Sequence, residues 1–306
     1  MNHQKTIRVA VQVEGIGLHS GRPVRVTISP GPPNSGIVFR VRGHPERIPA
    51  APESVSNSHY ATTIGRNGAR IQTVEHLMAA AAGFGIDNLE VEVEGGEIPA
   101  LDGSAKQFVT LLASAGKAQQ AATRRSIVIP YAIRVGDERR WIEIAPAPLL
   151  RITYTLHNEH PAIGWQELSW TPSERAFVEE FASARTYGFL RDVGFMRKNG
   201  LARGGSLENA IVLGKRGPIN GLRYPDEFVR HKILDLIGDL ALLGRPVMGH
   251  VSAFNAGHAL NVELVHAIQR ALGMERRAVA PAESGASFAP TPLTDGFGPN
   301  PGLARL

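Results

Sequence analysis

Two stretches of the sequence decide the fold: TVEHLMAAAAGFG at residues 73–85 and DEFVRHKILDLIGDLALL at residues 226–243. Each stretch predicts an α-helix that carries one histidine, His76 in the first and His231 in the second. A glycine follows seven residues after each histidine, as Gly83 and Gly238. The two helices therefore look like counterparts of one another.

The surroundings of these helices repeat as well. Each helix is followed by a strand pattern and then by a glycine, Gly103 or Gly257, that opens a last helix. A duplicated unit explains this repeat, although short helix–strand–helix units also resemble one another by chance. We therefore predict an α+β fold of two similar two-layer α/β sandwich domains, each a sheet covered by two helices.

The remaining elements follow from apolar periodicity and from glycine positions. Strands are expected at residues 7–13, 24–28, 89–93, 127–135, 141–144, 150–156 and 247–253, and further helices at 105–115, 173–184 and 258–272. The polar segment that follows Ile28, through Asn57, is expected to be irregular. A small, polar and basic cluster at 115–125 marks a boundary between a domain of residues 1–122 and one of residues 126–279. Residues 280–306 are rich in Pro, Gly, Ser and Ala, and we expect a disordered tail there.

Composition sets the class of protein. The 306 residues are 43% hydrophobic and 20% charged, which suffices for a large core and two domains. No apolar run reaches the roughly 20 residues of a membrane span, and Met1 to Lys5 leads into no apolar signal region, so a cytoplasmic protein is expected. The chain has no cysteine. Any metal site must therefore use histidine, carboxylate and water.

The net charge of +5 leaves the partner open. The basic residues are scattered and rarely lie beside aromatic residues, which argues against nucleic acid. A positive field also suits an anionic nucleotide-sugar or the surface of an anionic membrane, and charge alone does not choose between them.

The strongest local signal is His231 with Asp235, four residues apart on one face of the predicted helix. Asp239 extends the same face. A histidine and a carboxylate at this spacing can hold two corners of a tetrahedral zinc site, but an exposed ion pair has the same spacing.

Two further histidines lie beside features that suit catalysis. Glu75 precedes His76 and offers a base next to a third ligand, although Thr73 as a cap and an acidic first turn would account for the same residues. His258 follows a glycine at a helix start, where a solvent-exposed histidine is also common. Together these residues supply a metal with an open position, a base and a cationic donor, which is what amide hydrolysis requires.

Longer motifs carry a resemblance to a known family. They are GIGLHSG at 15–21, TVEHL at 73–77, GIDN at 85–88, EIP at 97–99, LDGSA at 101–105, ARTYGF at 184–189, GGS at 204–206, DEFVRHK at 226–232 and GHALN at 257–261. In these motifs the chain resembles the UDP-3-O-acyl-N-acetylglucosamine deacetylases, which commit this sugar to lipid A. The motifs cover nearly the whole chain except the tail.

The resemblance implies roles for eight polar residues. It implies zinc bound by His76, His231 and Asp235, with Glu75 as the general base. It further implies that a protonated His258, held by Asp239, protonates the leaving amine, and that Lys232 and Thr186 lie near the oxyanion.

The resemblance also implies an architecture for the substrate. The active site would lie between the domains, each domain would carry an insert, and the second insert, at about 187–213, would form an apolar passage for the acyl chain. Its candidate wall residues, which could equally pack the insert onto its own domain, are Phe189, Leu190, Phe195, Met196, Leu201 and Leu207. The predicted substrate contacts are Tyr187, Phe189, Leu201 and Leu207.

The chain departs from the family at two places. Tyr187 stands where the family commonly has Phe. Residues 157–159 read His-Asn-Glu, where the family tends to carry an acidic residue followed by an aromatic one that helps hold the uridine.

Two rival functions remain at this point: an amidase of the same fold for another acylated sugar, and a non-catalytic binding protein. The second has no chemical reason to retain Glu75 and His258 together. We expect a monomer that binds the acylated UDP-sugar and Zn²⁺, binds no nucleic acid, and makes at most peripheral contact with a membrane.

Overall fold

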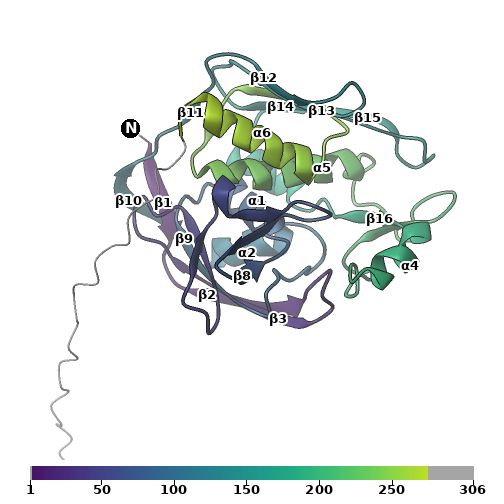
Figure 1. Ribbon diagram of the computed structural model, residues 1–306, viewed down its shortest axis with the longest axis horizontal. Helices are drawn as coiled ribbons and strands as arrows, with labels where there is room; N and C mark the ends of the chain where they lie inside the picture. The colour runs from purple at the N-terminus through teal and green to yellow at the C-terminus, as the bar shows by residue number, and fades with distance from the viewer. Residues whose placement is uncertain (1, 275–306) are drawn as a thin grey trace, which may run out of the picture.

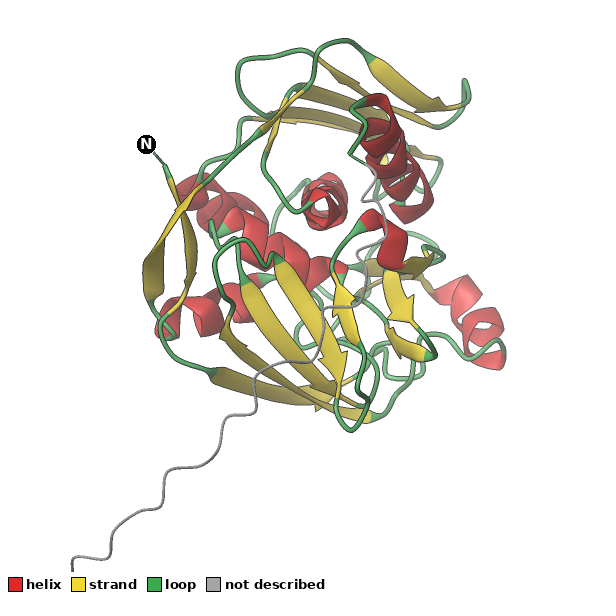
Figure 2. Ribbon diagram, turned by 60° about the vertical axis from the view of Figure 1, so that its left-hand side comes forward, coloured by secondary structure: helices red, strands yellow, loops and turns green. Residues whose placement is uncertain are grey.

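The structure is a computed structural model that describes residues 2–274. The structure contains two five-stranded sheets. They lie on opposite sides of the molecule, and the main helices of both halves lie between them (Figures 1 and 2). The predicted α+β fold of two sheet-and-helix sandwiches is confirmed. The end of the predicted second domain and the predicted tail at 280–306 lie outside the described residues.

The first sheet has the strand order β2-β3-β9-β4-β5. Only β4 and β9 run parallel to each other. Its elements are β2 (Val11–Ile16), β3 (Pro23–Pro30), β4 (Ile37–Val41), β5 (Arg47–Pro49) and β9 (Leu89–Glu94), with helices α1 (Glu75–Gly83) and α2 (Lys106–Ser114).

The second sheet repeats this topology as β12-β13-β19-β14-β15, with β14 and β19 as its only parallel pair. Its elements are β12 (Ile133–Gly136), β13 (Trp141–Ala145), β14 (Arg151–Asn158), β15 (Gly164–Trp170) and β19 (His250–Phe254), with helices α5 (Glu227–Leu240) and α6 (His258–Ala271). In each half the strand between the two helices becomes the central strand. The halves therefore share one fold, as the repeated sequence pattern predicted.

Alternation of side chains explains why each sheet buries one face. Leu89, Val91 and Val93 of β9 are buried, whereas the intervening glutamates are half-buried or exposed. Ile152 and Tyr154 of β14 follow the same rule. A strand with this period turns every second side chain toward the helices, so the core of each half lies between its sheet and its helix pair.

The first-half and second-half helices meet at α1 and α5. Helix α1 is rich in small side chains, and Ala79, Ala80 and Ala81 are fully buried. Gly238 of α5 lies directly against the backbone of Glu75, and a Cβ atom on Gly238 would collide with the Glu75 carbonyl oxygen. The absence of a side chain at Gly238 allows the two backbones to approach closely.

Each half carries additional elements outside its sandwich. In the first half, β6 (Val55–Asn57), β7 (Thr63–Arg66) and β8 (Ala69–Ile71) form a small antiparallel sheet after a 3₁₀ turn at Pro52–Ser54. In the second half, α3 (Glu174–Ala176) leads into a π-helical turn (Phe177–Phe181), and β16 (Tyr187–Phe189) pairs in parallel with β17 (Ile211–Leu213). Helix α4 (Leu190–Lys198) connects them, projects at the right of Figure 1, and buries no residue completely.

Each half also contains one further short strand pair outside its five-stranded sheet. β1 (His3–Ile7) pairs with β10 (Lys117–Thr123), and β11 (Ile127–Val128) pairs with β18 (Val247–Met248). The polar cluster at 115–125, expected as a boundary, thus contains a strand. A 3₁₀ turn at Ala241–Leu243 ends α5.

Several local predictions were wrong. The apolar pattern at 7–13 is two strands rather than one, since Val9 lies between β1 and β2 and is 57% exposed. The stretch up to Asn57, expected to be irregular, contains β4, β5 and β6, and β15 was not foreseen. The helix expected at 173–184 is one short turn followed by a π-helix. The strand expected at 127–135 is divided around Pro130, because proline has no N–H for a ladder.

Among residues 2–274, no helix combines the length and the apolar character needed to cross a membrane.

Candidate active site

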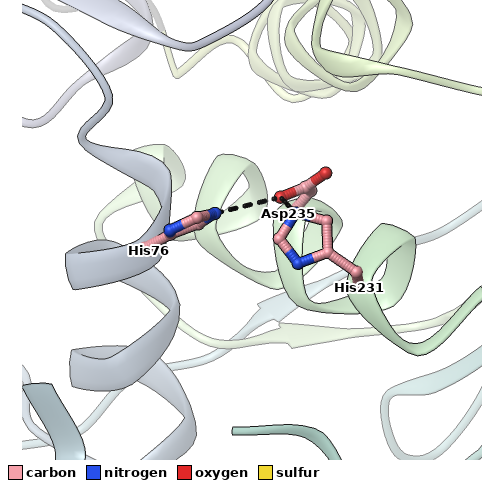
Figure 3. Close-up of side chains that lie close together, drawn as sticks. All are labelled: His76, His231 and Asp235. Atoms are coloured by element: carbon pink, nitrogen blue, oxygen red, sulfur yellow. Dashed lines mark ion pairs between the residues drawn. The ribbon is translucent and has the colours of Figure 1, made fainter. Parts of the chain in front are cut away.

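The predicted metal ligands His76, His231 and Asp235 lie together where α1 meets α5 (Figure 3). One ligand atom from each side chain lies within 4.8 Å of the others, and all three residues are buried. Oδ1 of Asp235 is 3.2 Å from Nε2 of His231 and 3.7 Å from Nε2 of His76. The two helices thus bring residues from both halves of the chain to one point.

Hydrogen bonds set the orientation of two of these ligands. Nδ1 of His231 is 3.1 Å from the carbonyl oxygen of Ala184, which requires the proton on Nδ1 and leaves Nε2 free. Nζ of Lys232 donates to Oδ2 of Asp235 at 2.8 Å, so that Oδ1 is the oxygen that faces the histidines. Such outer contacts are typical of metal centres.

The protonation states suit a cation. Burial lowers the pKa of His231 to about 3 and keeps the imidazole neutral. Burial opposes the ionisation of Asp235, but the neighbouring His231 and Lys232 lower its pKa well below the usual value. Neutral imidazole and ionised carboxylate are the forms that bind a metal.

The three side chains also have the chemistry of a metal site. Oδ1 of Asp235 is buried and makes no hydrogen bond within the described part of the chain. An ionised oxygen in that position is costly unless a donor or a cation faces it. Two histidines and one carboxylate are ligands that zinc accepts, with a fourth position left for water or substrate.

Glu75 lies beside this cluster, at the first position of α1, and is buried. Its Oε2 accepts the backbone N–H of Thr62 at 3.1 Å, and its Oε1 lies 3.8 Å from Nε2 of His258. Burial raises its pKa, in spite of the opposing effect of His258 and His76. The backbone leading to it is unusual, because Thr73 has a φ of 61°. This left-handed conformation is costly for a β-branched residue and fixes the entry into α1.

Thr73 does not cap α1, although the sequence allowed that interpretation. Val74 holds the N-cap position, and the Thr73 hydroxyl instead donates to Oε1 of Glu97 at 3.2 Å. Glu97 is buried and also accepts the backbone N–H groups of His19 and Ser20. Glu97 therefore holds the glycine-rich loop at 15–21 against the start of α1.

His258 opens α6 and faces the cluster from the other side. Its Nδ1 lies 2.8 Å from Oδ2 of Asp239, which is itself completely buried on α5. Burial lowers the pKa of His258, but the carboxylates of Asp239, Asp235 and Glu75 outweigh burial and raise it to about 10. His258 is therefore cationic at neutral pH, and its side chain is only 10% exposed rather than open to solvent.

A cavity of about 450 Å³ opens over these residues. Leu18, His19, Ser58, His59, Tyr60, Thr73, Glu75, His76, Thr186, Tyr187, His231, Lys232, Asp235, Gly257, His258 and Ala259 line it. A larger cavity of about 660 Å³, near Arg124 and Pro246, contains none of the predicted site residues. The smaller cavity is thus the candidate active site.

The remaining predicted residues divide into two groups. Thr186 and Tyr187 line the cavity, and Nζ of Lys232 lies 5.8 Å from the centre of the Tyr187 ring. Phe189, Leu201 and Leu207 do not line it. Phe189 and Leu201 are half-buried, and Leu207 is 47% exposed.

Sequence reasoning gave no role to several residues of this site. His19 lines the cavity, and its buried Nε2 has no hydrogen-bond partner among the described residues. Thr62 and Asn261 both donate to Asp239, at 2.6 and 2.9 Å. His19 and Asn261 stand in motifs that carried the family resemblance, whereas Thr62 lies in no motif, so that only the tertiary structure reveals it.

Comparisons with known proteins cover both halves of the chain. A profile of the family described as UDP-3-O-acyl N-acetylglycosamine deacetylase matches residues 4–270. A protein of Myxococcus xanthus named UDP-3-O-acyl-N-acetylglucosamine deacetylase is 50% identical over 271 residues, which cover 87% of this chain and 86% of the relative. Proteins of the same name from Oleidesulfovibrio alaskensis and Syntrophotalea carbinolica are 48% and 42% identical, over 263 and 272 residues. These matches cover 85% and 88% of this chain, and 86% and 88% of the two relatives. With a single family matched across both sandwiches and the cavity between them, the chain belongs to the UDP-3-O-acyl-N-acetylglucosamine deacetylase family.

Proposed function

We propose that this protein hydrolyses the N-acetyl amide of UDP-3-O-(3-hydroxyacyl)-N-acetylglucosamine, giving the free amine and acetate, as the committed step of lipid A synthesis. We propose further that it does so with Zn²⁺ held by His76, His231 and Asp235. The observation that carries this proposal is the cluster of those three side chains, whose Asp235 Oδ1 has no hydrogen-bond partner among residues 2–274, next to a buried glutamate and a largely enclosed cationic histidine. The names of the relatives support the choice of substrate.

A zinc ion bound there would lower the pKa of a coordinated water and polarise the amide carbonyl. Glu75 is the proposed general base, because its Oε1 faces the cluster while Oε2 is held by the Thr62 N–H. The raised pKa of Glu75 suits a group that accepts a proton from water.

His258 is the proposed general acid. Its raised pKa keeps a proton on the ring, and Asp239 fixes the ring by its contact with Nδ1, which directs Nε2 toward Glu75 and Asp235. An amide nitrogen leaves only when it is protonated, so a cationic donor at this position assists the departure of the amine.

Lys232 and Thr186 are the proposed oxyanion donors. Burial lowers the pKa of the Lys232 ammonium, but Asp235 and the two tyrosines Tyr187 and Tyr154 outweigh burial and raise it, so Lys232 keeps its charge. A fixed positive charge at the wall of the cavity stabilises developing negative charge strongly. The Thr186 backbone is fixed by bonds to Gly103 and Ile211, which places its side chain at the cavity wall.

The second-half insert is the proposed contact for the acyl chain, through Tyr187, Phe189, Leu201 and Leu207. We also propose that the protein acts as a monomer in the cytoplasm, where a nucleotide-sugar is available, and makes at most peripheral contact with a membrane. Sedimentation of the purified protein would check the oligomeric state, and fractionation of a cell lysate by sedimentation would check the location and the membrane contact.

The decisive experiment measures release of acetate from the acylated UDP-sugar before chelation, after chelation, and after addition of zinc or iron. Loss on chelation and recovery with zinc are expected, with little turnover of unacylated UDP-N-acetylglucosamine. Full activity in the chelated protein would refute the metal, and equal turnover of both sugars would favour the rival amidase.

A further inference from the structure

One buried threonine forms hydrogen bonds both to the proposed base and to the residue that holds the proposed acid. Thr62 lies immediately before β7 and is 1% exposed. Its backbone N–H donates to Oε2 of Glu75 at 3.1 Å. Its hydroxyl donates to Oδ1 of Asp239 at 2.6 Å. Glu75 and Asp239 belong to different halves of the chain, and Thr62 bonds to both.

The bond to Glu75 determines which of its oxygens is available. Oε2 is occupied by the Thr62 N–H, so Oε1 is the oxygen that faces His258. The Thr62 carbonyl also accepts the N–H of Val74, just before α1 begins. Thr62 therefore fixes the position of Glu75 relative to the start of its helix.

The bond to Asp239 fixes the other partner. Oδ2 of Asp239 meets Nδ1 of His258 at 2.8 Å and the amide of Asn261 at 2.9 Å, and Thr62 is the donor to Oδ1. With a donor on each oxygen, rotation of the carboxylate is opposed, and the contact with His258 keeps its geometry. The Thr62 hydroxyl is 3.3 Å from the same Nδ1, a less favourable distance than its bond to Asp239.

We propose that Thr62 is a positioning residue that sets the relative orientation of Glu75 and His258. This proposal rests on the proposed roles of those two residues as base and acid. Thr62 does not line the cavity, so it acts through its two partners and not by contact with the substrate.

The two bonds of Thr62 can be separated by mutation. The backbone bond to Glu75 survives any substitution, whereas the hydroxyl bond to Asp239 is lost in Thr62→Val, which keeps the shape of the side chain. Thr62→Ser keeps both bonds. Thr63→Val is a matched control, because Thr63 is a buried neighbour whose hydroxyl makes no hydrogen bond to residues 2–274.

The test measures kcat, KM, zinc content and thermal unfolding for the parent, these three variants and Asp239→Asn. Thr62→Val should lower kcat by roughly 10-fold or more, because small displacements of catalytic groups lower the reaction rate strongly. KM and zinc content should stay within about 2-fold of the parent, since neither the cavity wall nor the ligands change. Thr62→Ser should restore kcat, and Thr63→Val should leave it unchanged.

A double-mutant cycle gives an independent readout. If Thr62 acts through Asp239, Thr62→Val should have little further effect on kcat in the Asp239→Asn background. Parent-like kcat in Thr62→Val, additive effects in the cycle, or joint loss of zinc, stability and activity would each overturn the positioning role. An inactive parent protein would instead refute the proposed function, so the two failures are distinguishable.

Discussion

The carbonyl oxygen of Glu75 lies so close to Gly238 that no side chain fits between them. This contact joins α1 to α5 at the level of the proposed metal ligands. We expect Gly238→Ala to push the helices apart, to destabilise the protein by about 1–3 kcal/mol through overpacking, and to weaken zinc binding. Thermal unfolding and metal analysis of the purified variant would measure both effects.

Gly194→Ala on α4 is the control for that substitution. A Cβ atom on Gly194 meets nothing within 4 Å, and the helix should gain up to about 1 kcal/mol from the lower entropy of alanine. Equal behaviour of the two variants would show that the close approach at Gly238 does not matter.

Substitution of a metal ligand and substitution of the base should have different effects on zinc content. His76→Ala should lose zinc and activity together, because two remaining ligands hold the ion weakly. Glu75→Ala should lower turnover by roughly 10²-fold or more while zinc stays bound. His266→Ala, a half-buried histidine on α6, should change neither. Full zinc content in His76→Ala would refute the ligand assignment.

Activity should show a bell-shaped dependence on pH, because Glu75 must be ionised and His258 protonated. Burial raises the pKa of Glu75, so kcat/KM should increase as the pH rises through that elevated value. Although burial lowers the pKa of His258, Asp239 and the other carboxylates raise it to about 10, so activity should fall as the pH rises through about 10. Both limbs belong to the coupled site as a whole.

Asp239→Asn tests the origin of the alkaline limb. Asp239 contributes the largest favourable charge at His258, so its loss should move that limb to lower pH. Asp192→Asn, on exposed α4, should leave the profile in place. An unmoved alkaline limb in Asp239→Asn would exclude His258 as the titrating acid.

The acyl chain should contribute through the second-half insert. Each buried methylene is worth up to about 0.8 kcal/mol, so catalytic efficiency should climb steeply with chain length up to the limit of the passage. Leu201→Glu or Leu207→Glu should penalise long-chain substrates far more than one that lacks the acyl group. The comparison needs a series of acyl lengths for the parent and both variants. Uniform losses on every substrate would assign these leucines to the fold.

The sequence predicted the elements with a long, unambiguous period. Helices α1, α5 and α6 begin and end within two or three residues of their expected limits, since each is a long apolar-rich segment with a glycine at or soon after its C-terminal end. The short strands β4 and β5 escaped prediction because strands of three to five residues give too few alternations to be told from loop.

The candidate active site likewise contains some residues whose proximity the sequence predicted and others whose proximity it did not. His231 and Asp235 share a helix face, so their proximity follows from spacing alone. The approach of His76 and His258 depends on how two helices from different halves pack, and only the family resemblance brought these residues together in advance. Thr62 and Asp239 are distant in the sequence and meet only in the folded chain. No local pattern marks such a pair.

A chain without cysteine has no disulfide, and the proposed metal would be its nearest equivalent. About half of the chain separates His76 from His231, so an ion bound to both joins the two sandwiches across that length. Unlike a disulfide, this cross-link forms only in the folded state and strengthens by mass action. Each tenfold rise in free zinc above the dissociation constant would add about 1.4 kcal/mol to the stability of the docked halves. The strength with which the halves hold together would then follow the metal concentration around the protein and not its redox state.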